Sequence, residues 1–407
     1  MSVNEMKFEQ SAALLTSLVE QATGQKPLTP TDESEFVSLA QTTLRTNYDV
    51  MATAISQVLS RTIFSSRPYN AVFRGLQVDS EKWGGHIRKI NYIDLDIEDD
   101  DRYDLVENGS VDMYTVKKLH AVQTNFYGSN THQLHYTVYR DQLDAAFESS
   151  SQFGSFMAGA LQNIANQIEQ INENERRMAL QNLMSATLAD ADSRTIHLLT
   201  EYKNETGNTT ITAANWQSEA EFPYFVKWLY GFLNTTIDLM KERTALYHKN
   251  ITTYNGQPVK PIMRHTPRQN MKAFMLNSLM RHIDASVMSS VFHNELLDTI
   301  DFEAVNYWQS IETPAALSVT PVTMQADGTY AAGNAVSNNN VVGVLFDEEA
   351  AGTTIISNWS ATTPFNARGG YWNTFYHWNV RTWNDLTENC IVLCMDEAPT
   401  TEPGDGE

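Results

Sequence analysis

The chain has 407 residues, and its 49 acidic side chains outnumber the 28 basic ones to give a formal net charge of −21. A charge of this sign repels a phosphate backbone, which argues against a protein that coats or reads nucleic acid. No apolar run reaches the roughly 18 residues of a membrane-spanning helix, and the N-terminus lacks the basic and apolar stretches of a signal peptide. The length suggests about two or three domains.

The first 66 residues are predicted to be mainly helical. An amphipathic segment covers 11–22, and prolines at 27 and 30 separate it from a second helix over 32–44. A third helical pattern runs over 47–64 and ends before Pro68. Such a segment either packs on its own domain or forms an arm that reaches a neighbouring subunit.

Residues 67–128 are predicted to form a long β-hairpin. Side chains alternate with strand period over 83–93 and again over 111–119, and an acidic cluster at 94–104 lies between them. A two-stranded ribbon has little core of its own and is marginal in isolation, so we expect it to lie on another surface, such as a second subunit. The residues expected to contact basic groups of a partner are those of the acidic tip: Asp94, Asp96, Glu98, Asp99, Asp100, Asp101 and Arg102.

The acidic tip also invites comparison with a calcium loop, because Asp94, Asp96 and Glu98 occupy alternate positions. An EF-hand loop requires glycine at its sixth position and glutamate at its twelfth. These positions hold Asp99 and Leu105. The pattern therefore favours a solvated hairpin tip over a metal site.

Residues 129–151 contain two histidines, His132 and His135, three positions apart. The glutamate and third ligand of a metalloprotease helix are missing, so we interpret the pair as structural residues at a strand–helix junction.

A long helix is predicted over 152–189, with Ser151 as its N-cap. Its length would be roughly 55 Å, more than one compact core requires. Its apolar positions recur with helical period, and we expect them to face the β-strands near the C-terminus. They are Phe153, Met157, Ala160, Ile164, Ile168, Ile171 and Met178.

Residues 203–349 are predicted to form an α/β unit. Helical patterns cover 222–248 and 268–292, and strand-like patterns cover 259–267, 304–311 and 340–350.

Residues 350–396 return to strands, at 353–356, 371–383 and 389–396, and the tail 397–407 has the composition of a disordered segment. Cys390 and Cys394 lie four residues apart, about 13 Å along a strand, which is too far for a disulfide. We interpret both as buried free thiols, because no second Cys/His pair completes a zinc site.

Motifs of catalysis are absent from the sequence. It contains no P-loop, no glycine-rich dinucleotide fingerprint and no Gly-x-Ser-x-Gly elbow. The aromatic residues of 371–383 resemble a base-stacking platform, but basic residues do not accompany them, and strand period favours a role in the core. We therefore expect no catalytic residues, no cofactor and no metal.

Three stretches taken in order carry a resemblance to a known family: 83–97, which enters the hairpin; 125–161, which leads from a polar strand into the long helix; and 366–396, which is rich in aromatics and closes the chain. The layout resembles the major capsid protein of tailed bacteriophages, the Hong Kong 97-type fold. It is similar in particular to the type found in small protein-primed podoviruses and related Bacteroidetes-type phages.

The resemblance implies an α+β fold with named parts. Residues 1–66 would be the N-terminal arm, 67–128 the extended E-loop hairpin, and 203–349 the axial α/β domain. The peripheral domain would combine 129–202, which includes the long spine helix, with the closing β segment 350–396, and 397–407 would be a disordered tail.

The resemblance also implies a function. The chain would assemble as pentamers and hexamers into an icosahedral or prolate head that encloses the genomic DNA without sequence-specific binding. Its partners would be other copies, a scaffolding protein during assembly and a portal at one vertex, without a membrane. Assembly would occur in the host cytoplasm, and the product would be the virion. An alternative is another phage structural protein, such as a decoration or head-completion protein, and a further one is an enzyme with a deep pocket of titratable groups.

Overall fold

A computed structural model describes residues 8–24, 26–46, 73–78, 87–93, 106–109, 114, 116–119, 121–126, 128–254, 256–282 and 302–399. The chain divides into two compact units. Unit 1 combines Met1–Gly84, Gly128–Glu175 and Thr353–Arg381, and unit 2 combines Gly85–Tyr127, Arg176–Gly352 and Thr382–Glu407.

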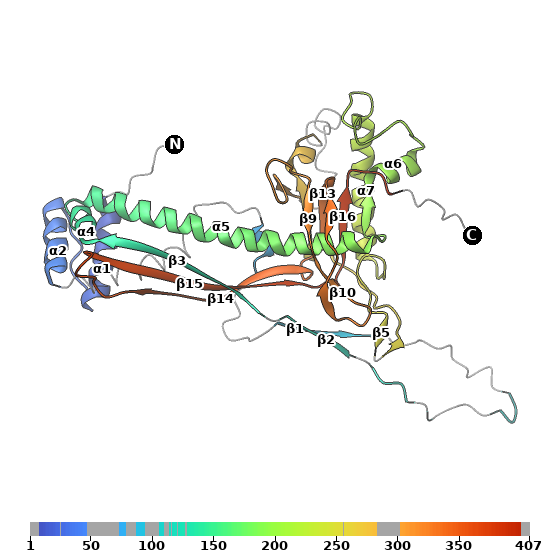
Figure 1. Ribbon diagram of the computed structural model, residues 1–407, viewed down its shortest axis with the longest axis horizontal. Helices are drawn as coiled ribbons and strands as arrows, with labels where there is room; N and C mark the ends of the chain where they lie inside the picture. Colours follow the sequence, from blue (N-terminus) through green and yellow to red (C-terminus); the bar gives the residue numbers. More distant parts are fainter. Residues whose placement is uncertain are drawn as a thin grey trace. The chain divides into compact units, whose positions relative to one another are not determined.

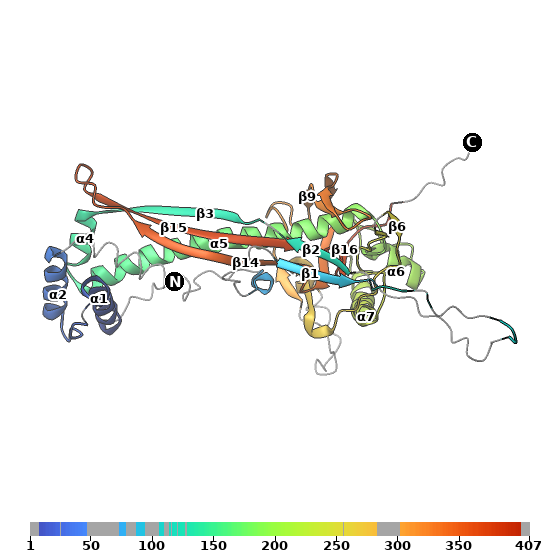
Figure 2. The ribbon, with the colours of Figure 1, turned by 90° about the horizontal axis from the view of Figure 1, so that it is seen from below.

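Unit 1 contains a three-stranded sheet in the order β14-β15-β3. These strands are β14 (Ala351–Thr362), β15 (Tyr371–Asn384) and β3 (Asn130–Tyr139), and β15 lies between the other two (Figure 2). The antiparallel register pairs Tyr371 with Tyr139 and Val380 with Asn130. Side chains of β15 alternate between buried and half-buried, so one face of the sheet belongs to the core. The predicted strands at 353–356 and 371–383 are confirmed.

The long predicted helix is α5 (Ser150–Asp190), which is 41 residues long and therefore about 60 Å. Its unit 1 portion runs along the three-stranded sheet (Figure 1). Phe153, Ile164 and Ile168 are buried in one cluster with Trp372, Tyr376, Trp378 and Val380 of β15. The predicted apolar stripe is thus confirmed at these three positions. It is wrong at Met178, which is 50% exposed, because the helix turns that position out of the core.

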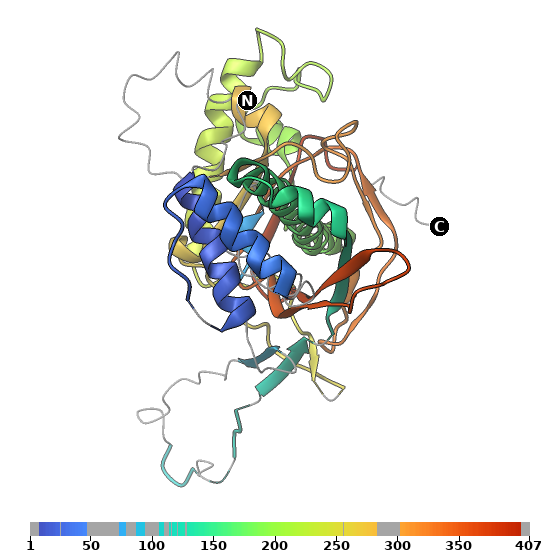
Figure 3. The same cartoon turned by 90° about the vertical axis from the view of Figure 1, so that its left-hand side faces the viewer.

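The same core also contains the N-terminal helices α1 (Phe8–Thr23) and α2 (Glu33–Thr46), with Leu15, Leu18 and Phe36 fully buried. The helices lie side by side near the start of α5 (Figure 3). Residues 8–46 therefore pack on their own unit, which agrees with one of the two readings of the N-terminal segment. The predicted helix over 47–64 lies outside the described residues.

The start of α5 differs from the prediction. Ser149 Oγ accepts a hydrogen bond from the Gln152 N–H at 3.2 Å, so Ser149, and not Ser151, acts as the cap. Ser150 is tied to α2, because its backbone N–H and its hydroxyl both donate to the Glu33 carboxylate. The helix begins at Ser150, two residues before the predicted start at 152. The short helix α4 (Arg140–Ala146) comes between β3 and α5.

Unit 2 is built on a five-stranded sheet in the order β4-β16-β13-β7-β8. The centre is entirely buried, because β13 (Val341–Asp347) and β16 (Cys390–Cys394) have no exposed position. Both strands match the sequence prediction, and Cys390 and Cys394 are buried free thiols as expected. The other three strands are β4 (Thr195–His197), β7 (Met271–Leu276) and β8 (Glu303–Val305).

Strand β7 contradicts the sequence prediction, which placed a helix over 268–292. Met271–Leu276 pairs antiparallel with β13 and parallel with β8. Met, Lys, Ala and Leu are good helix formers, but a short apolar run cannot be assigned by periodicity alone. Its two neighbours in the sheet decide the outcome. Within the described part of this stretch, residues 277–282 are α-helical and Arg268–Asn270 forms one 3-10 turn.

Helices α6 (Leu198–Thr206) and α7 (Phe222–Lys241) complete the main part of unit 2, and Figure 1 shows α7 beside the sheet. The strand predicted over 259–267 is wrong, because this stretch forms a loop with one isolated bridge at Arg264. The strand predicted over 304–311 is reduced to β8, which ends at Val305. Small two-stranded sheets fill the connections: β5 (Thr253–Tyr254) with β6 (Gln257–Pro258), β9 (Leu317–Val319) with β12 (Val336–Asn338), and β10 (Val322–Met324) with β11 (Tyr330–Ala332).

The hairpin also belongs to unit 2. Strand β1 (Ile87–Tyr92) confirms the first predicted strand, but its antiparallel partner is β2 (Ala121–Phe126). The second predicted strand, 111–119, is misplaced: its described residues, 114 and 116–119, form no strand. Side chains alternate in character over both 111–119 and 121–126, so the pattern alone does not tell which of the two is the strand. The pairing with β1 decides it. The acidic tip from Asp94 to Arg102 lies outside the described residues.

Candidate functional site

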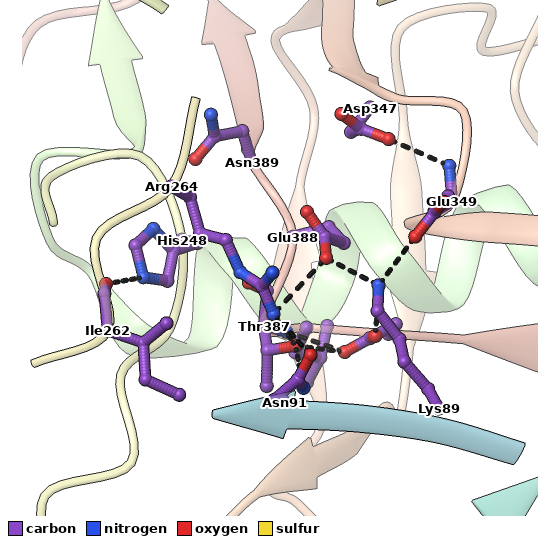
Figure 4. Close-up of polar contacts among 12 residues, drawn as sticks. Lys89, Asn91, His248, Ile262, Arg264, Asp347, Glu349, Thr387, Glu388 and Asn389 are labelled. Carbon is purple, nitrogen blue, oxygen red and sulfur yellow. Dashed lines mark hydrogen bonds and ion pairs between the residues drawn. The ribbon is translucent and has the colours of Figure 1, made fainter. Parts of the chain in front are cut away.

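The base of the hairpin carries a buried ion-pair cluster centred on Lys89 of β1 (Figure 4). The Lys89 ammonium lies 2.9 Å from Asp385 Oδ2, 2.9 Å from Glu349 Oε2, and in closer contact with Glu388 Oε1. The side chains of Asp385 and Glu388 are almost fully buried, at 1% and 7% exposure, whereas Glu349 is 64% exposed. Two of the three carboxylates are therefore out of water, and Lys89 is the cation that they share.

The acidic side of the cluster comes from a polar turn between β15 and β16. Asp385 Oδ1 accepts hydrogen bonds from the Thr387 N–H at 2.9 Å and the Thr387 hydroxyl at 2.6 Å. This local side-chain-to-backbone pattern is typical of an Asx turn. It leaves Asp385 Oδ2 directed at Lys89, so the turn presents a preformed anionic receptor to the hairpin.

Arg264 provides a second link between the hairpin and the same turn. Its Nη2 donates to Asn91 Oδ1 of β1 at 2.7 Å and lies 3.3 Å from Glu388 Oε1. Its Nε donates to the Thr387 carbonyl at 3.2 Å. Lys89 and Asn91 lie two positions apart on β1, so both point to the same face of the strand. One face of the hairpin base is thus held by two neighbouring contacts.

The charges in the cluster are shifted by their surroundings. Burial opposes the charge of Lys89, but the carboxylates of Asp385 and Glu388 outweigh that effect and raise the pKa of Lys89 above its ordinary value. Burial also raises the pKa of Glu388, and Lys89 and Arg264 offset only part of the rise. Lys89 is consequently a permanent cation at neutral pH.

Two further groups border the cluster. The Tyr330 hydroxyl accepts a hydrogen bond from the Leu386 N–H at 3.2 Å, and burial together with the Asp385 charge raises the pKa of Tyr330. His248 Nε2 donates to the Ile262 carbonyl at 2.7 Å, and burial lowers the pKa of His248. Because Tyr330 and His248 are neutral, the net charge of the cluster is set by its lysine, arginine and carboxylates alone.

The chemistry of this cluster is that of an anchor. Every charged group in it faces an opposite charge, and a matched ion pair has no free nucleophile or proton acceptor to offer a substrate. On the other face of the hairpin, Ile90 and Tyr92 are about half exposed. The hairpin is therefore fixed on one face and presents Ile90 and Tyr92, next to the exposed Arg88, on the other.

The two histidines singled out in the sequence are structural residues, and the acidic tip lies outside the described residues. His132 and His135 are on β3, three positions apart on a strand, so they point to opposite faces. His132 pairs with Glu175 at 3.0 Å, and His135 stacks on Phe375. The described ranges contain no group of three or more His, Cys, Asp or Glu able to hold a metal ion. They also contain no helix long and apolar enough to span a bilayer.

The anchor cluster was missed in the sequence because its members are far apart: β1, residue 264 and the turn at 385–388. A usable signal does exist. The stretch Asn384-Asp385-Leu386-Thr387-Glu388 is polar between two strongly apolar strands, and Asp385 and Thr387 have the spacing of an Asx turn. Lys89 is a charged residue within an alternating strand. Nothing in the sequence pairs the two.

The family of the chain is decided by a match over nearly its whole length. The model of the Phi29-like phage major capsid protein family matches residues 15–394. The chain belongs to this family. The anticipated phage capsid resemblance is thereby confirmed, and the chain is a major capsid protein that forms the phage head. No curated protein matches the sequence.

Solved structures similar to this major capsid protein include the capsid of Staphylococcus phage Andhra, with 13% identity, a TM-score of 0.46, and coverage of 81% of this chain and 85% of that one. The mature capsid of bacteriophage PhiM1 has 9% identity, a TM-score of 0.41, and coverage of 81% and 89%. The capsid of cyanophage P-SCSP1u has 10% identity, a TM-score of 0.40, and coverage of 80% and 88%.

Proposed function

We propose that this major capsid protein assembles as pentamers and hexamers into a closed icosahedral or prolate shell, with the β1–β2 hairpin as an E-loop that packs on a neighbouring copy. The observation that carries the proposal is the asymmetry of the hairpin. One face is anchored through Lys89 and Asn91, and the exposed side chains elsewhere in the segment include six large apolar ones among charged and polar neighbours: Ile90, Tyr92, Val106, Tyr114, Val116 and Leu119. Exposed apolar groups on an extended ribbon are typical of an interaction surface.

The parts of the subunit follow from this proposal. Residues 1–66 are the N-terminal arm, 67–128 the E-loop, 129–202 with 350–396 the peripheral domain, 203–349 the axial domain and 397–407 the tail. Helix α5 is the spine of the peripheral domain, and the acidic tip from Asp94 to Arg102 contacts basic groups of the next copy. A hairpin with little core of its own gains stability when assembly buries it.

The shell encloses DNA without reading its sequence, because a subunit with a net charge of −21 repels the phosphate backbone. We infer a scaffolding protein as a partner during assembly in the host cytoplasm and a portal at one vertex. The role is structural and needs no catalytic step, and the fully paired charges of the anchor cluster support this.

Negative-stain microscopy of the full chain, expressed with and without its scaffolding protein, tests the proposal. Closed shells or capsomer sheets are the expected result. A second sample in which 94–104 is replaced by an uncharged linker should fold but assemble poorly. A wild-type chain that stays monomeric under both conditions would contradict the proposal.

A further inference from the structure

The sheet of unit 1 has a second face, opposite to the face that packs on α5. We call it the aromatic face. It consists of alternate residues of β3 from Thr131 to Tyr139 and of β15 from Tyr371 to Asn379, together with Ser357 and Trp359 of β14. The strand register places these positions of β3 and β15 opposite one another. Ser357 belongs to the face because it accepts a hydrogen bond from Asn379, and Trp359 because it stacks on His377.

Four rings cross this face in a row from β14 to β3. Trp359 stacks on His377 with centroids 4.0 Å apart, His377 lies 6.4 Å from Phe375, and Phe375 lies 5.5 Å from His135. The planes are within 16–25° of parallel in each contact. The row holds rigid rings at the surface, and Trp359, at its edge, is 55% exposed.

The face contains no acidic residue, no lysine and no arginine. Its other members are Thr, Asn, Gln, Ser and Tyr, which contribute hydrogen-bonding groups without charge. The chain as a whole carries a net charge of −21. A surface rich in aromatic residues and depleted in charge has the composition of the core of a protein–protein interface.

We propose that the aromatic face is a contact surface for a second copy of this chain. Two copies of this acidic protein repel each other, and the repulsion is least where neither approaching surface carries carboxylates. Over the ten residues of β3, the three-stranded sheet measures roughly 33 Å by 14 Å, on the order of 450 Å². A stable interface buries about 800 Å² per partner, so the face supplies the centre of such a contact and needs a rim around it.

This inference rests on the proposed self-assembly and names a surface that carries it. The test compares four variants of the full chain: Trp359→Glu and Trp359→Lys, which place either charge in the face, Trp359→Phe, which keeps a ring, and Gln170→Glu as a matched control. Gln170 is exposed on α5 in the same unit and lies outside the face. Circular dichroism confirms that each variant folds.

Oligomer and particle yields are measured by sedimentation velocity and negative-stain microscopy. Both charged variants should associate at least about tenfold more weakly than wild type, because an unpaired charge in a contact costs on the order of 1.4 kcal/mol or more. Trp359→Phe and Gln170→Glu should assemble like wild type. Charged variants that assemble as well as Gln170→Glu would overturn the inference and leave self-assembly standing.

Binding of a short DNA duplex, measured by fluorescence anisotropy, tests whether DNA and not a second copy occupies the aromatic face. If Trp359→Lys binds the duplex more tightly than wild type while particle yields stay equal, the face contacts DNA and the inference is wrong. A wild-type chain that forms no oligomer at all would overturn both the proposed function and this contact.

Discussion

At the scale of single residues, Lys89 connects strand β1 to a distant segment of unit 2. It is the shared partner of two buried carboxylates, Asp385 and Glu388, from a segment almost 300 positions later. Removal of one member of a buried ion pair leaves its partners charged and desolvated, which costs far more than the pair contributes.

Lys89→Met should therefore lower the free energy of unfolding by roughly 3–5 kcal/mol, measured by urea denaturation. The matched change is Glu349→Gln, which removes the exposed carboxylate of the same cluster and should cost less than about 1 kcal/mol. Hydrogen exchange should show faster exchange in β1 and β2 for the first variant alone. Equal effects of the two changes would mean that the cluster is a surface network.

The two thiols give a prediction about pH. Burial raises the pKa of Cys390 to about 11 and that of Cys394, with help from the Asp396 charge, to about 12. The native state favours the protonated thiols, so their stabilising contribution is complete below the ordinary pKa of about 8.5 and is lost as pH rises through the native values. At pH 8 a thiol reagent such as DTNB should label neither cysteine until urea unfolds the chain. Rapid labelling of the native protein would contradict the burial of β16.

At the scale of elements, α5 connects sequence pattern to packing most directly. Its unit 1 portion buries Phe153, which contacts Phe36 and Phe147 with centroids 5.7 and 4.9 Å away. Phe153→Ala should destabilise the protein by about 3–5 kcal/mol, because it leaves a cavity among three elements. Met178→Ala, on the same helix at a half-exposed position, should change stability by less than about 0.5 kcal/mol. Thermal unfolding followed by circular dichroism compares the two, and similar losses would imply that Met178 is covered.

The elements also show what sequence could predict. Long or uniformly apolar patterns were assigned correctly: α5, β13, β15 and β16 each have a period or a run that only one structure satisfies. Strand β7 and strand β2 were misassigned because their identity depends on neighbours: β7 needs β13 and β8 beside it, and β2 needs the register of β1. The anchor cluster has the same origin, since Lys89, Arg264 and Glu388 meet only after the sheet of unit 2 forms. The local hydrophobic pattern is enough to predict long helices and buried strands. Which strands pair depends on contacts between distant parts of the chain, which a local pattern does not contain.

At the scale of the whole molecule, the net charge of −21 sets the conditions under which copies meet. Electrostatic repulsion between two such subunits acts over the Debye length, which is about 30 Å at 0.01 M salt and about 10 Å at 0.1 M. Assembly should therefore become faster as salt is added, because screening reduces the repulsion between subunits more than it weakens the ion pairs of the acidic tip.

The rise of light scattering by the full chain, followed at 10 mM and at 200 mM NaCl, should be several-fold faster at the higher salt. Sucrose of equal osmolality serves as the control, because it leaves charges unscreened. If ion pairs between the acidic tip at 94–104 and a neighbour dominate the contact, the order reverses and salt slows assembly. The sign of the salt effect thus decides whether the aromatic face or the acidic tip governs the first encounter between copies, and we expect the aromatic face.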